Sequence, residues 1–107
     1  MMSPERLKPT AQMAANAKRG LKLRERFGRG GTDVGVRRAT QLIAREELEP
    51  RDIKSMYSFF ARHSVDKQAA PHRWDCDEDP SAGFIAWLLW GGDEGKAWVD
   101  RQRSKLS

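Results

Sequence analysis

Basic side chains are concentrated in the first third of the chain. Residues 1–38 hold ten lysines and arginines against three acids, a balance of +7, whereas residues 75–107 hold four against seven, a balance of −3. On a helix, Lys18, Lys22 and Arg26 would share one stripe, with Arg19 beside it. Such a cluster attracts phosphate groups, because each contact releases counterions from a nucleic acid. The sequence therefore predicts a nucleic-acid surface in this part of the chain.

A glycine turn, Arg29 to Gly31, follows the basic run. Glycines ahead of a helix N-terminus let backbone N–H groups approach an anion closely. The complete P-loop and dinucleotide-binding patterns are absent, so we expect contact with phosphate groups and no nucleotide cofactor. The predicted nucleic-acid contacts, which include two later basic residues, are Lys18, Arg19, Lys22, Arg26, Arg29, Gly30, Gly31, Thr32, Arg37, Arg38, Arg62 and Lys67.

Residues 32–63 read as helix, short link and helix, which is the spacing of a helix-turn-helix. In that motif the second helix enters the major groove of DNA. Any two consecutive helices of a small bundle share this pattern, and the acidic link at 46–49 would repel a phosphate backbone. Base reading and plain helix packing therefore both remain open. The base-reading side chains would be Arg51, Lys54, Ser55 and Ser58.

Histidines, acids and the single cysteine between residues 63 and 79 are of the types that bind metal ions or transfer protons. His72 and Cys76 are four residues apart, but no second pair has ligand spacing, and a structural zinc needs four good ligands. The acidic run 75–79 lacks the glycine and distal glutamate of a calcium loop. His63 with Asp66 or Lys67 could exchange protons, but no nucleophile lies beside them. We expect no metal, no cofactor and no enzymatic activity.

The elements that must position these residues are helices. Thr10 and Gly28 are suited to begin and end a first helix, and Thr32 or Asp33 to begin a second, whose apolar side is Val36, Ala39, Leu42 and Ile43. A third helix runs from Pro50 to about His63, because Ile53, Met56, Tyr57 and Phe60 form a helical apolar stripe. Ser81 caps a fourth helix to Trp90, Gly91 and Gly92 end it, and Asp93 caps a fifth.

The predicted fold class is all-α, a compact bundle of four to five short helices with a helix-turn-helix-like pair in the middle. Residues 1–9 are expected to be a disordered lead-in, 10–104 a single domain, and 64–80 a long loop anchored by Trp74. The core is expected at Leu42, Ile53, Met56, Tyr57, Phe60, Ile85, Leu88, Leu89 and Trp98.

The cellular setting follows from what the sequence lacks. One cysteine, Cys76, cannot form an intramolecular disulfide. The longest hydrophobic run, 84–90, is far shorter than a membrane span, and the N-terminal residues do not resemble a signal peptide. We expect a cytoplasmic protein, in a bacterium or an infected cell.

Three separated strings resemble a small module of bacteriophage genomes. They are RGGTDVGVRRA at 29–39, MYSFFARHSVDKQ at 56–68 and PSAGFIAWLLWGGDEGKAW at 80–98. The module occurs alone or attached to head-maturation proteins such as prohead proteases, and its biochemical function is unsettled. The resemblance implies a chain of short helices and a viral origin, although the acidic segment between Gln68 and Pro80 departs from the module. Its matching polar and glycine positions are Arg29, Gly30, Gly31, Thr32, Arg38, Arg62, His63, Asp66, Lys67, Gly91, Gly92 and Asp93.

These patterns predict two alternative functions. The first is a phage-type accessory protein that binds nucleic acid, duplex DNA above all, through the basic first helix and the glycine turn. The alternative is an adaptor or inhibitor that docks a phage or host protein through an exposed aromatic face near 87–98. The expected location is the cytoplasm of the infected host, or the virion.

Overall fold

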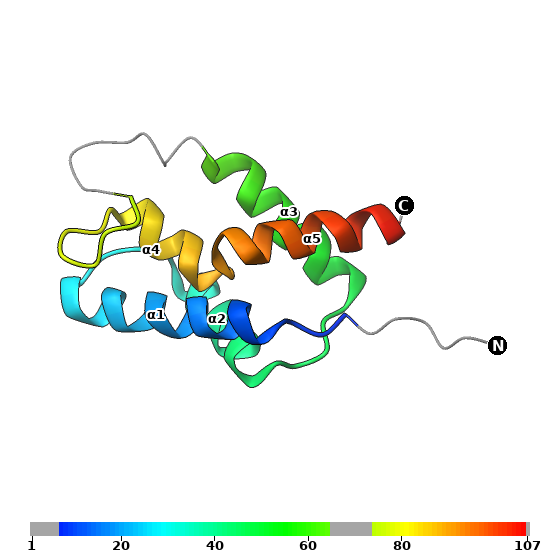
Figure 1. The fold of residues 1–107 in the computed structure, drawn as a ribbon, viewed down its shortest axis with the longest axis horizontal. Coiled ribbons are helices and arrows are strands. Elements are labelled where there is room, and N and C mark those ends of the chain that lie inside the picture. The colour runs from blue at the N-terminus through cyan, green and yellow to red at the C-terminus, as the bar shows by residue number, and fades with distance from the viewer. Residues whose placement is uncertain (1–6, 65–73, 107) are drawn as a thin grey trace.

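A computed structural model describes residues 7–64 and 74–106 of the chain (Figure 1). This part of the chain contains five helices, so the all-α prediction is confirmed. The helices are α1 (Ala11–Phe27), α2 (Asp33–Ala44), α3 (Pro50–His63), α4 (Ala82–Leu89) and α5 (Gly92–Leu106).

Local capping signals set most of these boundaries. The Thr10 hydroxyl accepts from the Met13 N–H at the start of α1, and Gly28 ends the helix in the left-handed conformation, with φ of 64°. The Thr32 and Ser81 side chains cap α2 and α4 in the same way. Each of these residues was predicted for this role, and Pro50 begins α3 as expected.

The start of α5 differs from the prediction. We expected both Gly91 and Gly92 to separate the last two helices and Asp93 to cap α5, but α5 begins at Gly92. Both glycines still shape the turn, because Gly91 and Gly92 have positive φ values of 116° and 70°, and adding a Cβ to Gly91 would crowd Gly95 at 3.0 Å. Asp93 lies in the first turn of α5, where its carboxylate accepts from the Trp87 indole N–H at 2.9 Å.

The helices form two groups that share α4. Helix α1 packs along both α2 and α4, while α3 packs mainly across α5 (Figure 1). Helices α2 and α3 make no close backbone contact with each other. The helix-turn-helix-like pair is therefore not confirmed, because the two helices of that motif pack together. This separation of α3 from α2 leaves space for a groove, described below.

Most of the predicted core residues are buried, among them Leu42, Ile53 and Leu89, each with no exposed surface. Tyr57 is an exception, because it is only partly buried and the Arg103 guanidinium lies 4.1 Å from the centre of its ring. Phe59 takes its place in the core. Trp74 anchors the segment before α4, as predicted, through edge contacts with Phe84 and Trp87.

The last residues of the predicted N-terminal lead-in are packed. The Leu48 N–H donates to the Leu7 carbonyl at 2.7 Å, and the Arg45 Nε donates to the Pro9 carbonyl at 2.9 Å. Pro9 itself is fully buried. Residues 7–9 therefore belong to the folded domain; the rest of the predicted lead-in lies outside the described residues.

Across 7–64 and 74–106, none of the helices combines the length and apolar character that a bilayer crossing requires.

Candidate functional site

Three of the predicted contacts form a basic stripe on the outer face of α1. Lys18, Lys22 and Arg26 are exposed, four residues apart, on the side opposite the buried Met13 and Ala17. None of the three forms an ion pair with a residue that the structure describes. We call these residues the basic stripe; they keep their charges available to an anion in solution.

Two other predicted arginines are paired with acids of the loop before α4. The Arg19 Nε donates to the Asp77 carboxylate at 2.9 Å, and Asp75 lies 3.3 Å away. The hydrogen bond to Asp77 raises the pKa of the Arg19 guanidinium. Arg29 donates to the Pro80 carbonyl at 2.8 Å and pairs with Asp79 at 3.2 Å. These contacts attach the loop to α1, so Arg19 and Arg29 already have carboxylate partners, and their role in nucleic-acid binding stays a prediction.

Arg38 is buried between three helices. Its Nη1 donates to Asp52 of α3 at 3.0 Å and to Gln41 at 2.8 Å, and its guanidinium lies 5.2 Å from the centre of the Trp90 ring. Only 9% of the side chain is exposed. Arg38 therefore joins α2 to α3, where a phosphate would have to compete with Asp52 for its guanidinium; its role in nucleic-acid binding stays a prediction.

The Asp52 carboxylate is the acidic half of this junction. Burial raises the pKa of Asp52, but hydrogen bonds from the Glu49 N–H and from Arg38, with the charges of Arg38 and Arg51, outweigh burial and hold it below its ordinary value. The second carboxylate oxygen accepts from the Glu49 N–H at 2.8 Å and so caps α3. One acid thus fixes both the start of α3 and its attachment to α2.

The glycine turn packs against α4. A Cβ on Gly30 would lie 2.5 Å from the Ile85 side chain, and one on Gly31 would lie 2.6 Å from Leu89. Both residues also have positive φ values, 98° and 76°. The Gly30 carbonyl accepts from the Arg24 Nε at 2.9 Å. These glycines are explained by close helix packing, so they do not support a phosphate-binding turn.

The remaining predicted contacts are spread over other surfaces. Thr32 caps α2, Arg37 is exposed on α2, Arg62 is exposed on α3, and Lys67 lies outside the described residues. Of the predicted contacts, Lys18, Lys22 and Arg26 are therefore the ones that share one exposed helix face. Of the proposed base-reading residues, Arg51, Lys54, Ser55 and Ser58 are all exposed, but α3 is not presented as a recognition helix.

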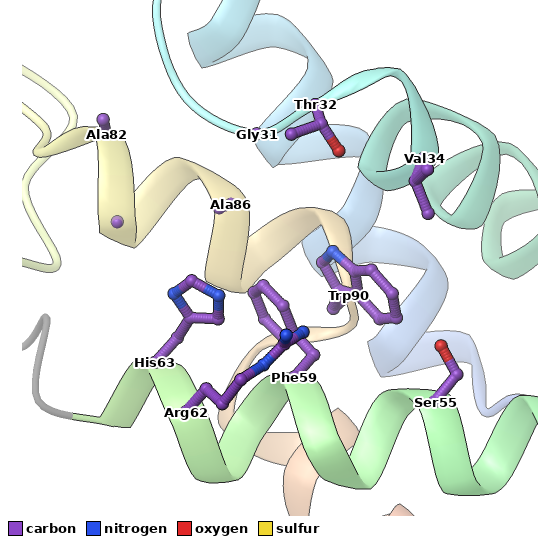
Figure 2. Close-up of a pocket in the computed structure, with 11 residues that line it drawn as sticks. Gly31, Thr32, Val34, Ser55, Phe59, Arg62, His63, Ala82, Ala86 and Trp90 are labelled. Carbon is purple, nitrogen blue, oxygen red and sulfur yellow. The ribbon is translucent and has the colours of Figure 1, made fainter.

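A groove of about 530 Å³ lies between α2, α3 and α4 (Figure 2). We call it the α2–α3–α4 groove. Its volume is within the range of ligand sites. Apart from Ser55, its lining residues come from three segments of the chain, 29–39, 56–68 and 80–98. Its lining is Gly31, Thr32, Val34, Ser55, Phe59, Arg62, His63, Ala82, Gly83, Ala86 and Trp90.

Sequence reasoning did not identify this groove. The large residues of α4 are buried, whereas Ala82, Gly83 and Ala86 form a more exposed face of small side chains. That run of small residues was an available signal. The exposure of Val34, at 51%, was not predictable, because it depends on the gap between α2 and α3.

The predicted aromatic face is buried. Trp87, Trp90 and Trp98 are 1%, 7% and 5% exposed. Trp90 stacks on Phe59 with their ring centres 4.5 Å apart, and Trp87 meets Phe60 edge-on at 4.8 Å. The cue for the adaptor prediction is therefore wrong, since the tryptophans close the core of a small domain.

No metal-binding cluster of three or more His, Cys, Asp or Glu side chains occurs among the residues that the structure describes. Asp66, Lys67 and His72, which the metal and acid–base hypotheses invoked, lie outside them. His63 packs its ring 4.5 Å from that of Phe59.

No protein family model matches the chain, and neither a curated protein nor a solved structure is significantly similar to it.

Proposed function

We propose that this protein binds nucleic acid through the basic stripe of α1. The observation that carries the proposal is that Lys18, Lys22 and Arg26 share one exposed helix face and are not neutralised by any acid in the described part of the chain. The net charge of +5 favours the same class of ligand.

The basic stripe has a length suited to contact with the phosphate backbone of a nucleic acid. Successive members are four residues apart, so they advance about 6 Å along the helix axis and the stripe spans about 12 Å. Lysine and arginine side chains on such a face contact phosphate groups, which position a protein without reading bases. The proposed ligand is therefore duplex DNA bound without sequence preference. The setting is that of a phage-type accessory protein in the infected cell or the virion, as the resemblance suggests.

Charge-neutralising variants test this proposal. Lys18→Gln, Lys22→Gln and Arg26→Gln together remove three charges from the stripe. The matched control is Arg51→Gln, Lys54→Gln and Arg101→Gln, three exposed cations on α3 and α5. Binding of a fluorescein-labelled 20-base-pair duplex is followed by anisotropy at low salt.

The stripe variant is expected to lose at least tenfold in affinity, since about three phosphate contacts disappear, whereas the control should lose only the smaller effect of net charge. Equal losses in the two variants would contradict the proposal, because binding would then depend on overall charge and on no particular face.

A further inference from the structure

We propose that the α2–α3–α4 groove is a docking site for a peptide segment of a partner protein, one that carries an apolar anchor side chain beside a carboxylate. This inference does not depend on nucleic-acid binding, because no member of the basic stripe lines the groove.

Part of the groove lining is apolar. Val34 and Leu106 are the two large hydrophobic side chains with high exposure in the described part of the chain, and Val34 lines this groove. Figure 2 shows Val34 on α2 and the Phe59 side chain on α3 on opposite sides of the groove. An aliphatic or aromatic anchor placed between them would remove apolar surface from water, which favours binding.

Small residues allow a peptide backbone to approach closely. Gly31, Ala82, Gly83 and Ala86 line the side formed by the glycine turn and α4. Because these side chains do not extend beyond a methyl group, the wall they form is shallow and smooth. A peptide can therefore lie against α4, in the manner of peptide segments that occupy hydrophobic grooves of binding domains.

The charge of the groove selects an acidic partner. No carboxylate is among its lining residues, and Arg62 extends over the groove beside Phe59 (Figure 2). Arg62 forms no ion pair with a described residue. The capped N-termini of α2 and α4, at Thr32 and Ala82, also lie at the groove, and their dipoles favour negative charge. A carboxylate of the peptide would pair with Arg62.

The aromatic residues favour a peptide over a nucleic-acid base. His63, Phe59 and Trp90 form a row in which neighbouring ring centres are 4.5 Å apart, and the Arg38 guanidinium lies 5.2 Å from the centre of the Trp90 ring. Phe59 and Trp90 are therefore largely covered by their neighbours, with 5% and 7% of their surface exposed. A base needs an open ring face on which to stack. An anchor side chain needs only the apolar edges that remain.

The test begins with selection of binders from a displayed library of random 12-residue peptides on the full-length protein. The expected result is enrichment of sequences that combine Asp or Glu with a large apolar residue. A selected peptide is then synthesised and its affinity measured by fluorescence anisotropy against four variants, each shown by circular dichroism to be folded.

Arg62→Glu should weaken the peptide about tenfold or more, because it replaces a charge-assisted pair by repulsion. Lys54→Glu is the matched control, with the same charge change on the same helix outside the groove, and should change affinity less than about threefold. Ala86→Leu should abolish binding by filling the groove. Val34→Asn is a second groove variant at an exposed position and should weaken binding too.

Three outcomes would overturn the proposal. The first is that no peptide is enriched, or that the enriched peptides lack acids. The second is binding that survives both Arg62→Glu and Ala86→Leu. The third is that a ten-nucleotide oligo-dT displaces the peptide from both the wild type and the stripe variant, and that direct binding of the oligo-dT is lost in Ala86→Leu, which would make the groove a nucleic-acid site. Failure of the stripe variant to affect DNA leaves these results unchanged, so the two proposals fail separately.

Discussion

Replacing Arg38 by methionine should destabilise the fold severely while leaving DNA binding intact. The substitution keeps much of the apolar stem but removes the hydrogen bonds to Asp52 and Gln41 and the contact with Trp90. Removing one partner of a fully buried ion pair costs about 3–5 kcal/mol. Asp52 is 19% exposed and keeps the Glu49 N–H, so a smaller cost of about 2–3 kcal/mol is expected here. That cost corresponds to a melting temperature lower by roughly 10–15 °C.

The assay is urea unfolding of the wild type, Arg38→Met, Asp52→Asn and the double variant. Arg38 and Asp52 should show a coupling energy of about 1–2 kcal/mol, because each side chain stabilises the fold mainly through its contact with the other. Arg37→Met is the control, since Arg37 is the exposed neighbour and should change stability by less than about 0.5 kcal/mol. If Arg38→Met is as mild as Arg37→Met and instead reduces DNA affinity, Arg38 is a nucleic-acid contact and the structural account of it is wrong.

Three further predictions follow from the same contacts. In the folded protein the pKa of Asp52 lies below its ordinary value of 3.8. The ionised carboxylate therefore contributes its full stabilisation above pH 3.8, and this contribution is lost as the pH falls through the folded pKa. The difference in unfolding free energy between wild type and Asp52→Asn should shrink below about pH 4. A difference that persists unchanged at lower pH would contradict the assignment. Gly30→Ala should cost about 1–3 kcal/mol more than Gly28→Ala in thermal or urea unfolding, since both require a positive φ but only Gly30 would collide with Ile85; equal costs would show that packing against α4 does not explain this glycine. Asp77→Asn should release Arg19 next to the basic stripe and so raise DNA affinity. The control is Asp100→Asn, which makes the same charge change at the ion pair with Lys96 on α5 and should raise DNA affinity less. Equal gains in anisotropy titrations would mean that the Asp77 pair does not restrain a DNA contact.

Helix boundaries were predictable because their signals are local. Thr10, Thr32 and Ser81 cap helices through a backbone N–H three residues away, and Pro50 and Gly28 act through their own backbone geometry. The start of α5 was missed because Gly92 has the positive φ of a turn residue and is also the first residue of the helix, which the sequence G-G-D does not reveal. Tyr57 was wrongly predicted to be a core residue, because an apolar stripe does not show how much of that helix face the neighbouring helices cover.

The candidate site was less predictable, because charge runs do not show which cations meet acids far along the chain. Arg19 and Arg29 pair with acids about fifty residues later, and Arg38 enters the core beside Trp90. Lys18, Lys22 and Arg26 lie on the outer face of α1, whereas Arg19 lies beside the loop before α4, Arg29 lies in the glycine turn and Arg38 lies on α2. A groove made by the separation of α2 from α3 is likewise a tertiary property. In the sequence, only the small side chains of α4 indicated the groove.

The salt dependence of DNA affinity is the most direct test of nucleic-acid binding by the basic stripe. If the basic stripe supplies three phosphate contacts, log affinity should fall against log salt concentration with a slope of about −2.7, which is roughly a 40-fold loss between 50 and 200 mM salt. The triple stripe variant should have a slope close to zero, and the triple control variant should keep the wild-type slope. An absence of DNA binding at 50 mM salt, or a slope that the stripe variant leaves unchanged, would contradict nucleic-acid binding by this face of α1.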